Sequence, residues 1–307
     1  KDFNSSLIQF KNNSLNWSRS HGNNTSNRFS SLNQINSLNA KNIKLAWIFK
    51  HDGYKSDIQA NPIVNDGVIY TPISGGFIAA IKADTGQLIW KSKEYGYYVA
   101  RRGLVYWNND KSLEPRLYFS NREKLICLNA LTGEEIKSFG GDGMIRTGLN
   151  VLTPVINNES NEIIIATWDR SVEVYDLFTG KTKWKLKYYP NKNTRVGGKK
   201  YNNTGANPWG GISFDAKRQI LYLATGNPHS YYDGTLRPGN NIGASSINAI
   251  DVRKATHKYL FSKSPQRITL RKIELRIRVP PIVGVPCLVR CVSGPSFLTT
   301  CPTWISF

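Results

Sequence analysis

The chain has 307 residues and a formal net charge of +20, from 41 Lys and Arg against 21 Asp and Glu. Such a charge raises nucleic acid or an anionic surface as a partner. However, residues 253–307 alone hold ten Lys or Arg and one acid, Glu274, and elsewhere no basic stripe alternates with aromatic residues. We therefore expect a solvated, lysine-rich surface and no nucleic-acid-binding face. The sequence contains no apolar run long enough to cross a bilayer and no signal-peptide pattern.

Residues 1–16 are rich in Asn, Ser and Lys and show no periodicity, which predicts a mobile N-terminus. From residue 17 onward, short β-rich runs alternate with turns that contain Asp, Asn, Gly and Thr. No segment sustains the 3.6-residue apolar period of a long amphipathic helix. The sequence therefore predicts a fold that is almost entirely β.

Three stretches repeat and align without gaps: AIKADTGQLIW (80–90), CLNALTGEEIK (127–137) and VYDLFTGKTKW (174–184). Their glycines, Gly86, Gly133 and Gly180, lie 47 residues apart, a period typical of propeller blades. Each copy predicts a hairpin between the last two strands of a blade, with the final Trp packed between neighbouring blades. The second copy ends in Lys137, so we expect one such contact to be missing.

A fourth copy begins at Ala249–Arg253 and breaks, because Lys254 and Ala255 stand where Thr-Gly would follow. Beyond it the turn glycines become rare and three of the four cysteines appear. We interpret residues 254–307 as an atypical basic tail, out of frame or foreign to the repeat. The remaining cysteine, Cys127, lies in an apolar strand and is expected to be a small buried hydrophobe.

Residues 207–228, NPWGGISFDAKRQILYLATGNP, predict a β-hairpin. Its strands run from Gly211 to Phe214 and from Gln219 to Thr225, and a polar turn joins them. This places Trp209, before the first strand, and Asn227, after the second, at the same end of the hairpin.

The repeats, together with W-x-x-x-H-G, RRGLVYW, NPWGGISFD and LATGNP, resemble the pyrroloquinoline quinone (PQQ) dependent dehydrogenases over residues 17–253. The resemblance implies an all-β, eight-bladed quinoprotein propeller, here apparently the N-terminal part, truncated to about half the ring. It also implies oxidation of alcohol or aldose hydroxyl groups in the periplasm, with a quinone or a cytochrome as electron acceptor.

The resemblance assigns five residues to the cofactor: Gln59, Arg102, Thr153, Trp209 and Asn227. Arg102 corresponds to the arginine that pairs with a PQQ carboxylate, and Trp209 to the aromatic ring under the flat quinone. Asn227 corresponds to a calcium ligand, and Asp169 is a further candidate. Each residue also has a purely structural interpretation. Gln59 and Thr153 fit polar residues at strand ends, and Arg102 fits a surface arginine like its neighbour Arg101. Trp209 fits a packing aromatic, and Asn227 fits a turn residue.

Two departures from the family limit what the sequence predicts. The vicinal cysteine pair of the methanol-oxidising members is absent, and no counterpart of the family's general-base Asp is identifiable, so no catalytic residue is assigned. We therefore expect impaired or no activity, and weak folding because half a ring exposes sheet edges. The alternatives are a non-catalytic propeller scaffold of the outer-membrane assembly type and a non-functional fragment.

Overall fold

The computed structural model describes residues 16–109, 113–188, 194–196, 199–201, 205–228, 241 and 243–262. The chain divides into residues 1–264 and residues 265–307, and all described residues belong to the first unit. Residues 1–15 of the predicted mobile N-terminus, and the basic tail beyond Ser262, lie outside the described residues. Within the described ranges the one helical element is a 3-10 turn, η1 (Ala40–Asn42), so the prediction of an all-β fold is confirmed.

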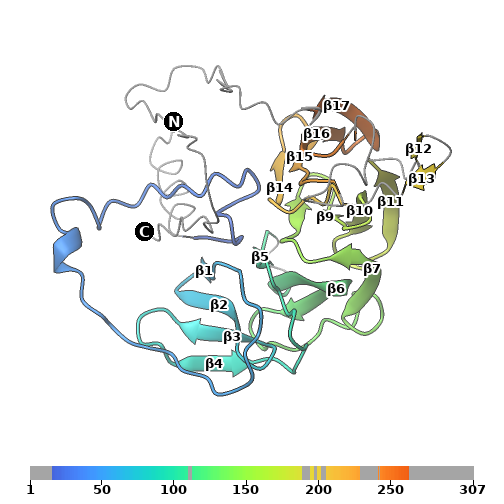
Figure 1. Cartoon of the computed structure of the whole chain (residues 1–307). Helices are drawn as coiled ribbons and strands as arrows, with labels where there is room; N and C mark the ends of the chain where they lie inside the picture. Colours follow the sequence, from blue (N-terminus) through green and yellow to red (C-terminus); the bar gives the residue numbers. More distant parts are fainter. Residues whose placement is uncertain are drawn as a thin grey trace, which may run out of the picture. The chain divides into compact units, whose positions relative to one another are not determined.

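Four antiparallel sheets follow one another along the chain, each with its strands in sequence order (Figure 1). The first contains β1 (Ile63–Asn65), β2 (Val68–Ile73), β3 (Phe77–Lys82) and β4 (Leu88–Lys91). The second contains β5 (Leu104–Trp107), β6 (Arg116–Asn129) and β7 (Met144–Asn150). The third contains β8 (Val155–Asn157), β9 (Glu162–Ala166), β10 (Ser171–Asp176) and β11 (Thr182–Lys187), and the fourth contains β14 (Ile212–Asp215), β15 (Ile220–Ala224), β16 (Ser246–Asp251) and β17 (Thr256–Ser262).

These sheets are the blades of a β-propeller, as the 47-residue repeat predicts. Neighbouring blades touch through their first strands, since β1 contacts β5, β5 contacts β8, and β8 contacts β14. A small hairpin of β12 (Thr194–Val196) and β13 (Lys199–Tyr201) stands between the third and fourth blades in the chain. The first strands of the four blades therefore form one row, and loops from several blades can meet beside it.

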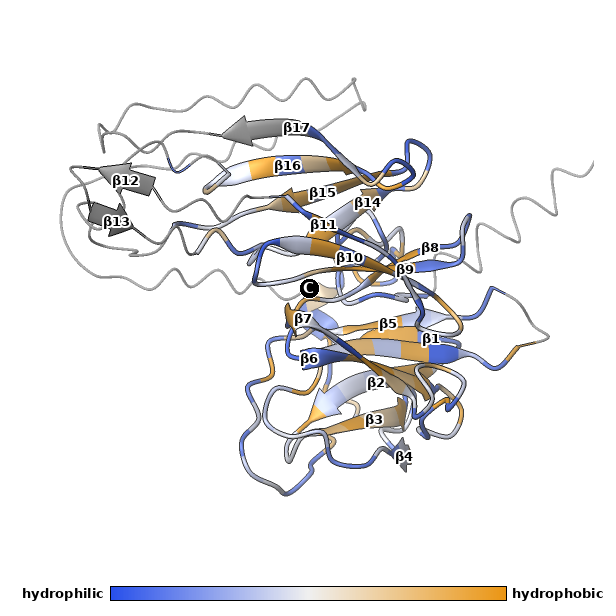
Figure 2. Cartoon of the chain, turned by 90° about the vertical axis from the view of Figure 1, so that its right-hand side faces the viewer, coloured by the Kyte–Doolittle hydropathy of each residue, from blue (hydrophilic) through white to orange (hydrophobic). Residues whose placement is uncertain are grey.

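The middle strands of each blade are apolar because both of their faces are covered. All five residues of β9, EIIIA, are buried, whereas β11, TKWKLK, alternates exposed and half-buried side chains. The hydropathy colouring in Figure 2 shows hydrophobic residues along middle strands such as β3 and β15. Cys127 is fully buried in this core, as expected from its apolar strand.

Two tryptophans dock on turn glycines in the way that the repeat predicts: Trp47, from the segment before β1, on the first blade, and Trp90, from the first blade, on the second. The ring of Trp47 lies so close to Gly86 that a Cβ there would be 2.6 Å from it, and Trp90 lies closer still to Gly133. Each indole Nε1 donates to a backbone carbonyl of the same turn, at 3.1 Å for Trp47 and 3.0 Å for Trp90. Both glycines have positive φ, so the turn and the ring contact each require glycine.

The seam between the second and third blades uses different residues, because the second repeat ends in lysine. Ile145 and Phe139 cover Gly180 where the other turn glycines meet an indole ring. The carbonyl of Leu177, which corresponds to the acceptor of the indole N–H, receives the hydroxyl of Tyr118 at 2.6 Å. The predicted loss of one tryptophan contact is confirmed, and a phenol replaces the missing donor.

The fourth hairpin extends beyond the break that the sequence predicts after Arg253. Strand β17 pairs with β16 from Asp251↔Thr256 to Ser246↔Ser262. Ala255 occupies the position of the turn glycines and adopts φ +50°, which an L-residue reaches only at an energetic cost. The expectation was wrong here because the turn forms without its glycine.

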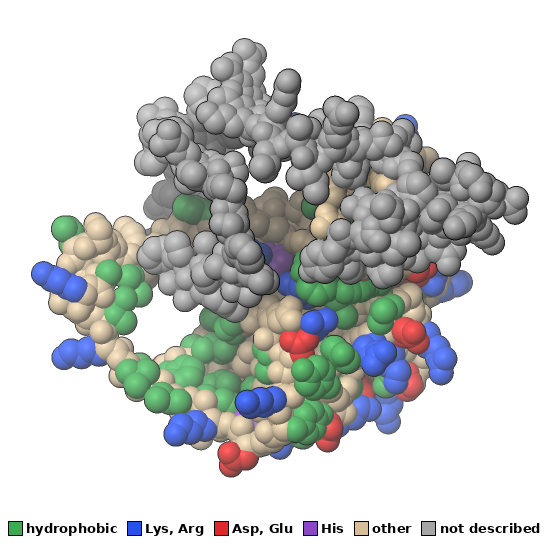
Figure 3. Space-filling model, in the orientation of Figure 1, with side chains coloured by type: hydrophobic (Ala, Val, Ile, Leu, Met, Phe, Trp, Pro, Cys, Tyr) green, Lys and Arg blue, Asp and Glu red, His purple; other side chains and the backbone are tan. Residues whose placement is uncertain are grey.

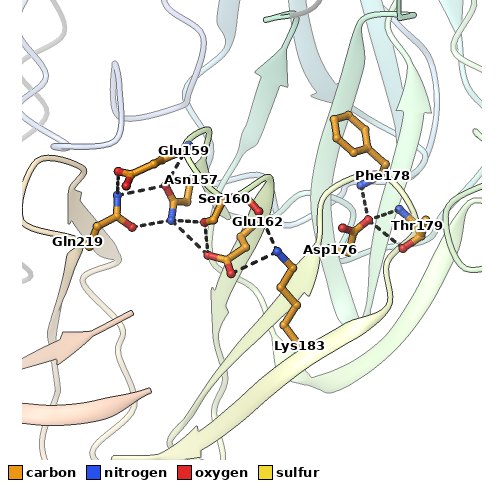
Figure 4. A network of polar contacts seen from close by, with 9 residues as sticks. All are labelled: Asn157, Glu159, Ser160, Glu162, Asp176, Phe178, Thr179, Lys183 and Gln219. Carbon is orange, nitrogen blue, oxygen red and sulfur yellow. Dashed lines mark hydrogen bonds and ion pairs between the residues drawn. The ribbon is translucent and has the colours of Figure 1, made fainter. Parts of the chain in front are cut away.

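A buried polar network connects the third and fourth blades (Figure 4). The amide of Asn157 donates to the carbonyl oxygen of Gln219 at 2.7 Å, and the Gln219 amide donates to Glu159 at 2.8 Å. Lys183, from β11, forms an ion pair with Glu162 at 3.4 Å. Because Asn157 and Gln219 are almost fully buried, these bonds fix the register of the two neighbouring turns.

The segment of residues 16–28 runs along the first strands of all four blades. Its backbone forms hydrogen bonds with two of these strands. Trp17 pairs with Val64 of β1, and Ser20 N–H donates to the Leu104 carbonyl of β5. Asn24 then bridges the third and fourth blades, because its amide donates to the carbonyl of β8 residue 156 at 2.7 Å and its carbonyl accepts from β14 residue 214. One short segment thereby contacts four blades.

Arg19 is the largest fully buried side chain of this segment, with 1% of its surface exposed. Its guanidinium donates to the carbonyls of Pro154, Thr153 and Ile212 at 2.8, 3.0 and 3.1 Å, and to the Ser26 hydroxyl at 2.7 Å. Desolvation lowers the pKa of Arg19 to about 9, so the group stays charged at neutral pH. Its contacts with these three carbonyls stabilise the junction of the blades.

An extended segment between residues 29 and 48 exposes apolar side chains to solvent. Phe29, Leu38 and Leu45 have 70%, 83% and 77% of their surfaces exposed. Figure 3 shows such hydrophobic side chains along the segment that leads toward the first blade. Only Trp47, near its end, is anchored to a blade, through the contact with Gly86.

Candidate functional site

The predicted hairpin is formed by β14 and β15, with its turn at residues 216–219. Beyond the open end of the hairpin the two chains remain paired: Ala206 N–H donates to the Asn227 carbonyl, and Gly226 N–H donates to the Asn207 carbonyl, both at 2.8 Å. Trp209 and Asn227 therefore lie at the same end of the hairpin, as predicted.

Trp209 is 45% exposed, although it is a large aromatic residue. Its ring centroid lies 5.2 Å from that of Trp168, which follows β9 in the third blade, with 35° between the planes. A small pocket beside the two rings is lined mainly by apolar groups, including Leu149, Ala166 and Pro208. The hairpin and the third blade thus present a pair of aromatic rings at one exposed position.

Two arginines of the loop before β5 lie over the Trp209 ring. The guanidinium carbon of Arg102 is 4.4 Å from the ring centroid and that of Arg101 is 5.6 Å away. The Nε atoms of both are buried and have no hydrogen-bond partner. Desolvation, and then repulsion from Arg101, lower the pKa of Arg102, while Asp57 opposes this change. Both groups are charged donors with spare hydrogen-bonding capacity.

Gln59 joins this group through Arg101 and Asp57. Its backbone N–H donates to the Arg101 carbonyl at 3.0 Å, and its side-chain amide donates to Asp57 at 2.8 Å. Asp57 in turn forms an ion pair with Arg101 at 2.5 Å. The exposed Gln59 therefore lies at the edge of the arginine pair, held by the carboxylate that neutralises one of the two guanidiniums.

Thr153 lies behind the arginines, with 2% of its surface exposed. Its hydroxyl donates to the backbone carbonyl of Arg102 at 2.6 Å. In this structure the hydroxyl therefore fixes the backbone from which the Arg102 side chain extends. The sequence suggested a donor to the cofactor, and that role stays a prediction.

The two candidate metal ligands have neutral partners. The Asn227 amide oxygen accepts a hydrogen bond from the Ser245 hydroxyl at 3.1 Å. Asp169 accepts from Thr167 and, at 3.3 Å, from Ser171. The described contacts do not join Asn227 to Asp169, and the described residues contain no group of three or more His, Cys, Asp or Glu side chains suited to a metal ion.

The structure thus brings Gln59, Arg102, Thr153 and Trp209 into one connected cluster. Sequence reasoning missed Asp57 and Trp168 and treated Arg101 only as an ordinary basic neighbour. The available signals were short: an acid two residues before Gln59, a second arginine in RRGLVYW, and a tryptophan directly before Asp169. None of these patterns specifies a contact until the blades are placed side by side.

Comparisons with known proteins identify the family of the chain. Residues 17–262 match the family model described as the β-propeller domain of glucose, ethanol and alcohol dehydrogenases that contain PQQ. Subunit 1 of methanol dehydrogenase (cytochrome c) from Methylorubrum extorquens is 26% identical, over 85% of this chain and 48% of that protein. The quinohemoprotein alcohol dehydrogenase of Comamonas testosteroni is 25% identical, over 78% of this chain and 37% of that protein.

Solved structures show the same fold. The quinohemoprotein alcohol dehydrogenase ADHIIG of Pseudomonas putida superposes with a TM-score of 0.66 at 23% identity, covering 86% of this chain and 42% of that chain. A europium-containing methanol dehydrogenase gives a TM-score of 0.61 at 19% identity, covering 85% of this chain and 51% of that chain.

The chain spans about half the length, or less, of the curated relatives described above. No helix among the described residues is both long and apolar enough to cross a membrane. The repeat, the docked tryptophans, the four meander sheets and the family match over residues 17–262 lead to one conclusion. The chain belongs to the PQQ-dependent dehydrogenase family and forms part of its quinoprotein β-propeller.

Proposed function

We propose that this chain contributes the cofactor floor of a dehydrogenase that uses PQQ to oxidise alcohol or aldose hydroxyl groups. The observation that carries the proposal is the stacking of Arg102 on the half-exposed Trp209 ring, with a buried Nε that lacks a partner. An aromatic face beside an unsatisfied guanidinium is complementary to a flat carboxylate.

The residues present fit such a cofactor. PQQ is a planar ring system with three carboxylates, and the site offers two guanidiniums, an aromatic face and the exposed amide of Gln59. When bound, the quinone supplies the hydride acceptor for the alcohol carbon. Trp209 would carry the ring plane, Arg102 would bind a carboxylate at its edge, and Thr153 would hold the Arg102 backbone in place.

Arg102 covers the Trp209 face at 4.4 Å, so a planar ligand on that face takes the place of the guanidinium. The side chain then turns to the edge of the ligand, where its donors meet a carboxylate. This rearrangement exchanges a cation–π contact of about 1 kcal/mol for a charge-assisted hydrogen bond of about 2 kcal/mol.

A calcium ion is the second cofactor of the proposal. The Asn227 amide oxygen would be one ligand and the Asp169 carboxylate a further one, because hard cations take oxygen donors. In the contacts that the structure describes, both side chains accept from hydroxyl groups, and such weak neutral donors can be exchanged for an ion. The catalytic base is not assigned, and we propose a quinone or cytochrome acceptor and a periplasmic location by analogy with the family.

The test is a titration of the purified chain with PQQ in the presence of calcium, followed by quinone absorbance and tryptophan fluorescence. Trp209→Phe should retain saturable binding, because it keeps a flat ring, and Trp209→Ala should lose at least tenfold in affinity. Binding that is equally strong in all three proteins would place the quinone elsewhere. No binding to the unmodified chain would reject the proposed function and favour a non-catalytic propeller.

A further inference from the structure

Arg101 has an unusual environment at the edge of the proposed cofactor floor. Its guanidinium carbon lies 5.6 Å from the Tyr98 ring centroid and the same distance from the Trp209 ring centroid. Its Nε is buried without a partner, and among the described residues its ion pair is with Asp57. The side chains of Arg101 and Asp57 are only 18% and 23% exposed. The guanidinium is therefore partly desolvated, flanked by two rings and incompletely hydrogen-bonded.

The charge around this position is strongly unbalanced. Arg102 stacks on Trp209, one of the two rings beside Arg101. The guanidinium carbon of Arg122 lies 5.3 Å from the ring centroid of Tyr98, the other ring. Among the described residues, Asp57 is the one carboxylate that forms an ion pair with any of these three arginines. Three cations with a single counter-ion favour a ligand that carries more than one negative charge.

We propose that Arg101 is a second carboxylate-binding residue for the planar cofactor, and that Asp57 is the exchangeable counter-ion that occupies it in the ligand-free chain. The inference rests on the proposed function, because the ligand is the same planar tricarboxylate. Arg102 and Arg101 then bind two different carboxylates of one molecule, and Asp57 sets how strongly the site selects a polyanion.

The contacts of Asp57 show how the exchange can occur without loss of the loop. Its backbone N–H donates to the Tyr97 carbonyl at 3.3 Å, and the Gln59 amide donates to its carboxylate at 2.8 Å. When a ligand carboxylate takes Arg101, Asp57 keeps the Gln59 amide and access to water. The Gln59 amide thus holds Asp57 at the edge of the site.

The experiment compares dissociation constants for PQQ with calcium in four variants, measured by quinone absorbance. Asp57→Asn removes the competing charge and should tighten binding about fivefold, since a unit charge at contact distance is worth about that factor. Arg101→Gln should weaken it by a similar factor. The control variants Asp52→Asn and Arg146→Gln make the same charge changes at exposed positions. They should leave the dissociation constant for PQQ unchanged.

A second probe, benzene-1,3,5-tricarboxylate, separates the two hypotheses because it is planar and carries three carboxylates but has no quinone. Binding of PQQ that is unaffected by Asp57→Asn and Arg101→Gln overturns the inference and leaves the proposed function standing. Binding of the tricarboxylate alone, tightened by Asp57→Asn and weakened by Arg101→Gln, supports the arginine clamp and rejects PQQ. Failure of both probes with the unmodified chain and with Asp57→Asn overturns both.

Discussion

The guanidinium of Arg102 lies 4.4 Å above the ring of Trp209, and its backbone carbonyl accepts the hydroxyl of Thr153. The backbone is fixed, whereas the guanidinium is held by a cation–π contact and has an unsatisfied Nε. A side chain anchored at its base and weakly held at its tip can turn toward a carboxylate without moving the loop.

We therefore expect both Arg102→Gln and Arg102→Lys to weaken PQQ binding by tenfold or more. A bidentate charge-assisted pair contributes about 2 kcal/mol, and lysine cannot reproduce its planar fork. Isothermal titration with PQQ measures the loss. Full affinity in Arg102→Lys would mean that only the charge matters, and not the planar geometry.

Trp90→Ala should lower the free energy of unfolding by about 3 kcal/mol, because it removes a large aromatic contact between the first two blades. The indole hydrogen bond to the neighbouring turn, at 3.0 Å, is lost as well. Urea denaturation followed by circular dichroism measures the change. Leu131→Ala, at a residue 66% exposed, is the control and should cost less than about 0.5 kcal/mol.

The sequence predicted the blades because their determinants are local and periodic: a turn glycine and an apolar strand recur every 47 residues, and a tryptophan ends the first and third copies. It could not predict the seam at Gly180, where Ile145 comes from a strand of another blade. The same limit applies to the site. Trp209 and Arg102 were identified from motifs, but the contact of Arg101 with Asp57 joins two separate loops that only the fold brings together.

Ala255→Gly should raise the free energy of unfolding by about 0.5–1 kcal/mol. Ala255 has φ +50°, and glycine removes the Cβ penalty of that conformation although it costs some chain entropy. Thermal unfolding of the two proteins under identical conditions gives the comparison. The converse change, Gly86→Ala, should destabilise the first blade, because φ there is +72° and the Trp47 ring occupies the space of a Cβ. A stabilising Gly86→Ala would contradict the docking contact.

Arg19→Ala should be among the most destabilising single changes, at about 3–5 kcal/mol. The substitution leaves buried carbonyls of the third and fourth blades without their donor, including that of Pro154 at 2.8 Å and that of Ile212 at 3.1 Å. Arg19→Lys keeps the charge but has three donors in place of five, so it should recover only part of the loss. Equal stability of Arg19→Lys and the unmodified chain would show that the charge, and not the set of hydrogen bonds, stabilises the junction.

Stability should also fall as the pH is lowered from about 6.5 to about 4, because of His21. Desolvation, and then the positive charges of Arg19, Arg28 and Arg102, lower the pKa of His21 to about 4 in the folded chain. In the unfolded chain the imidazole binds a proton near pH 6.5, so below that value protonation favours unfolding. The contribution of the neutral His21 to the free energy of unfolding is fully present above pH 6.5. After allowance for solvent screening it amounts to about 1–2 kcal/mol. His21→Gln should flatten the stability profile between pH 4 and pH 6.5 relative to the unmodified chain, measured by urea denaturation at each pH, and an unchanged slope would assign the dependence to other groups.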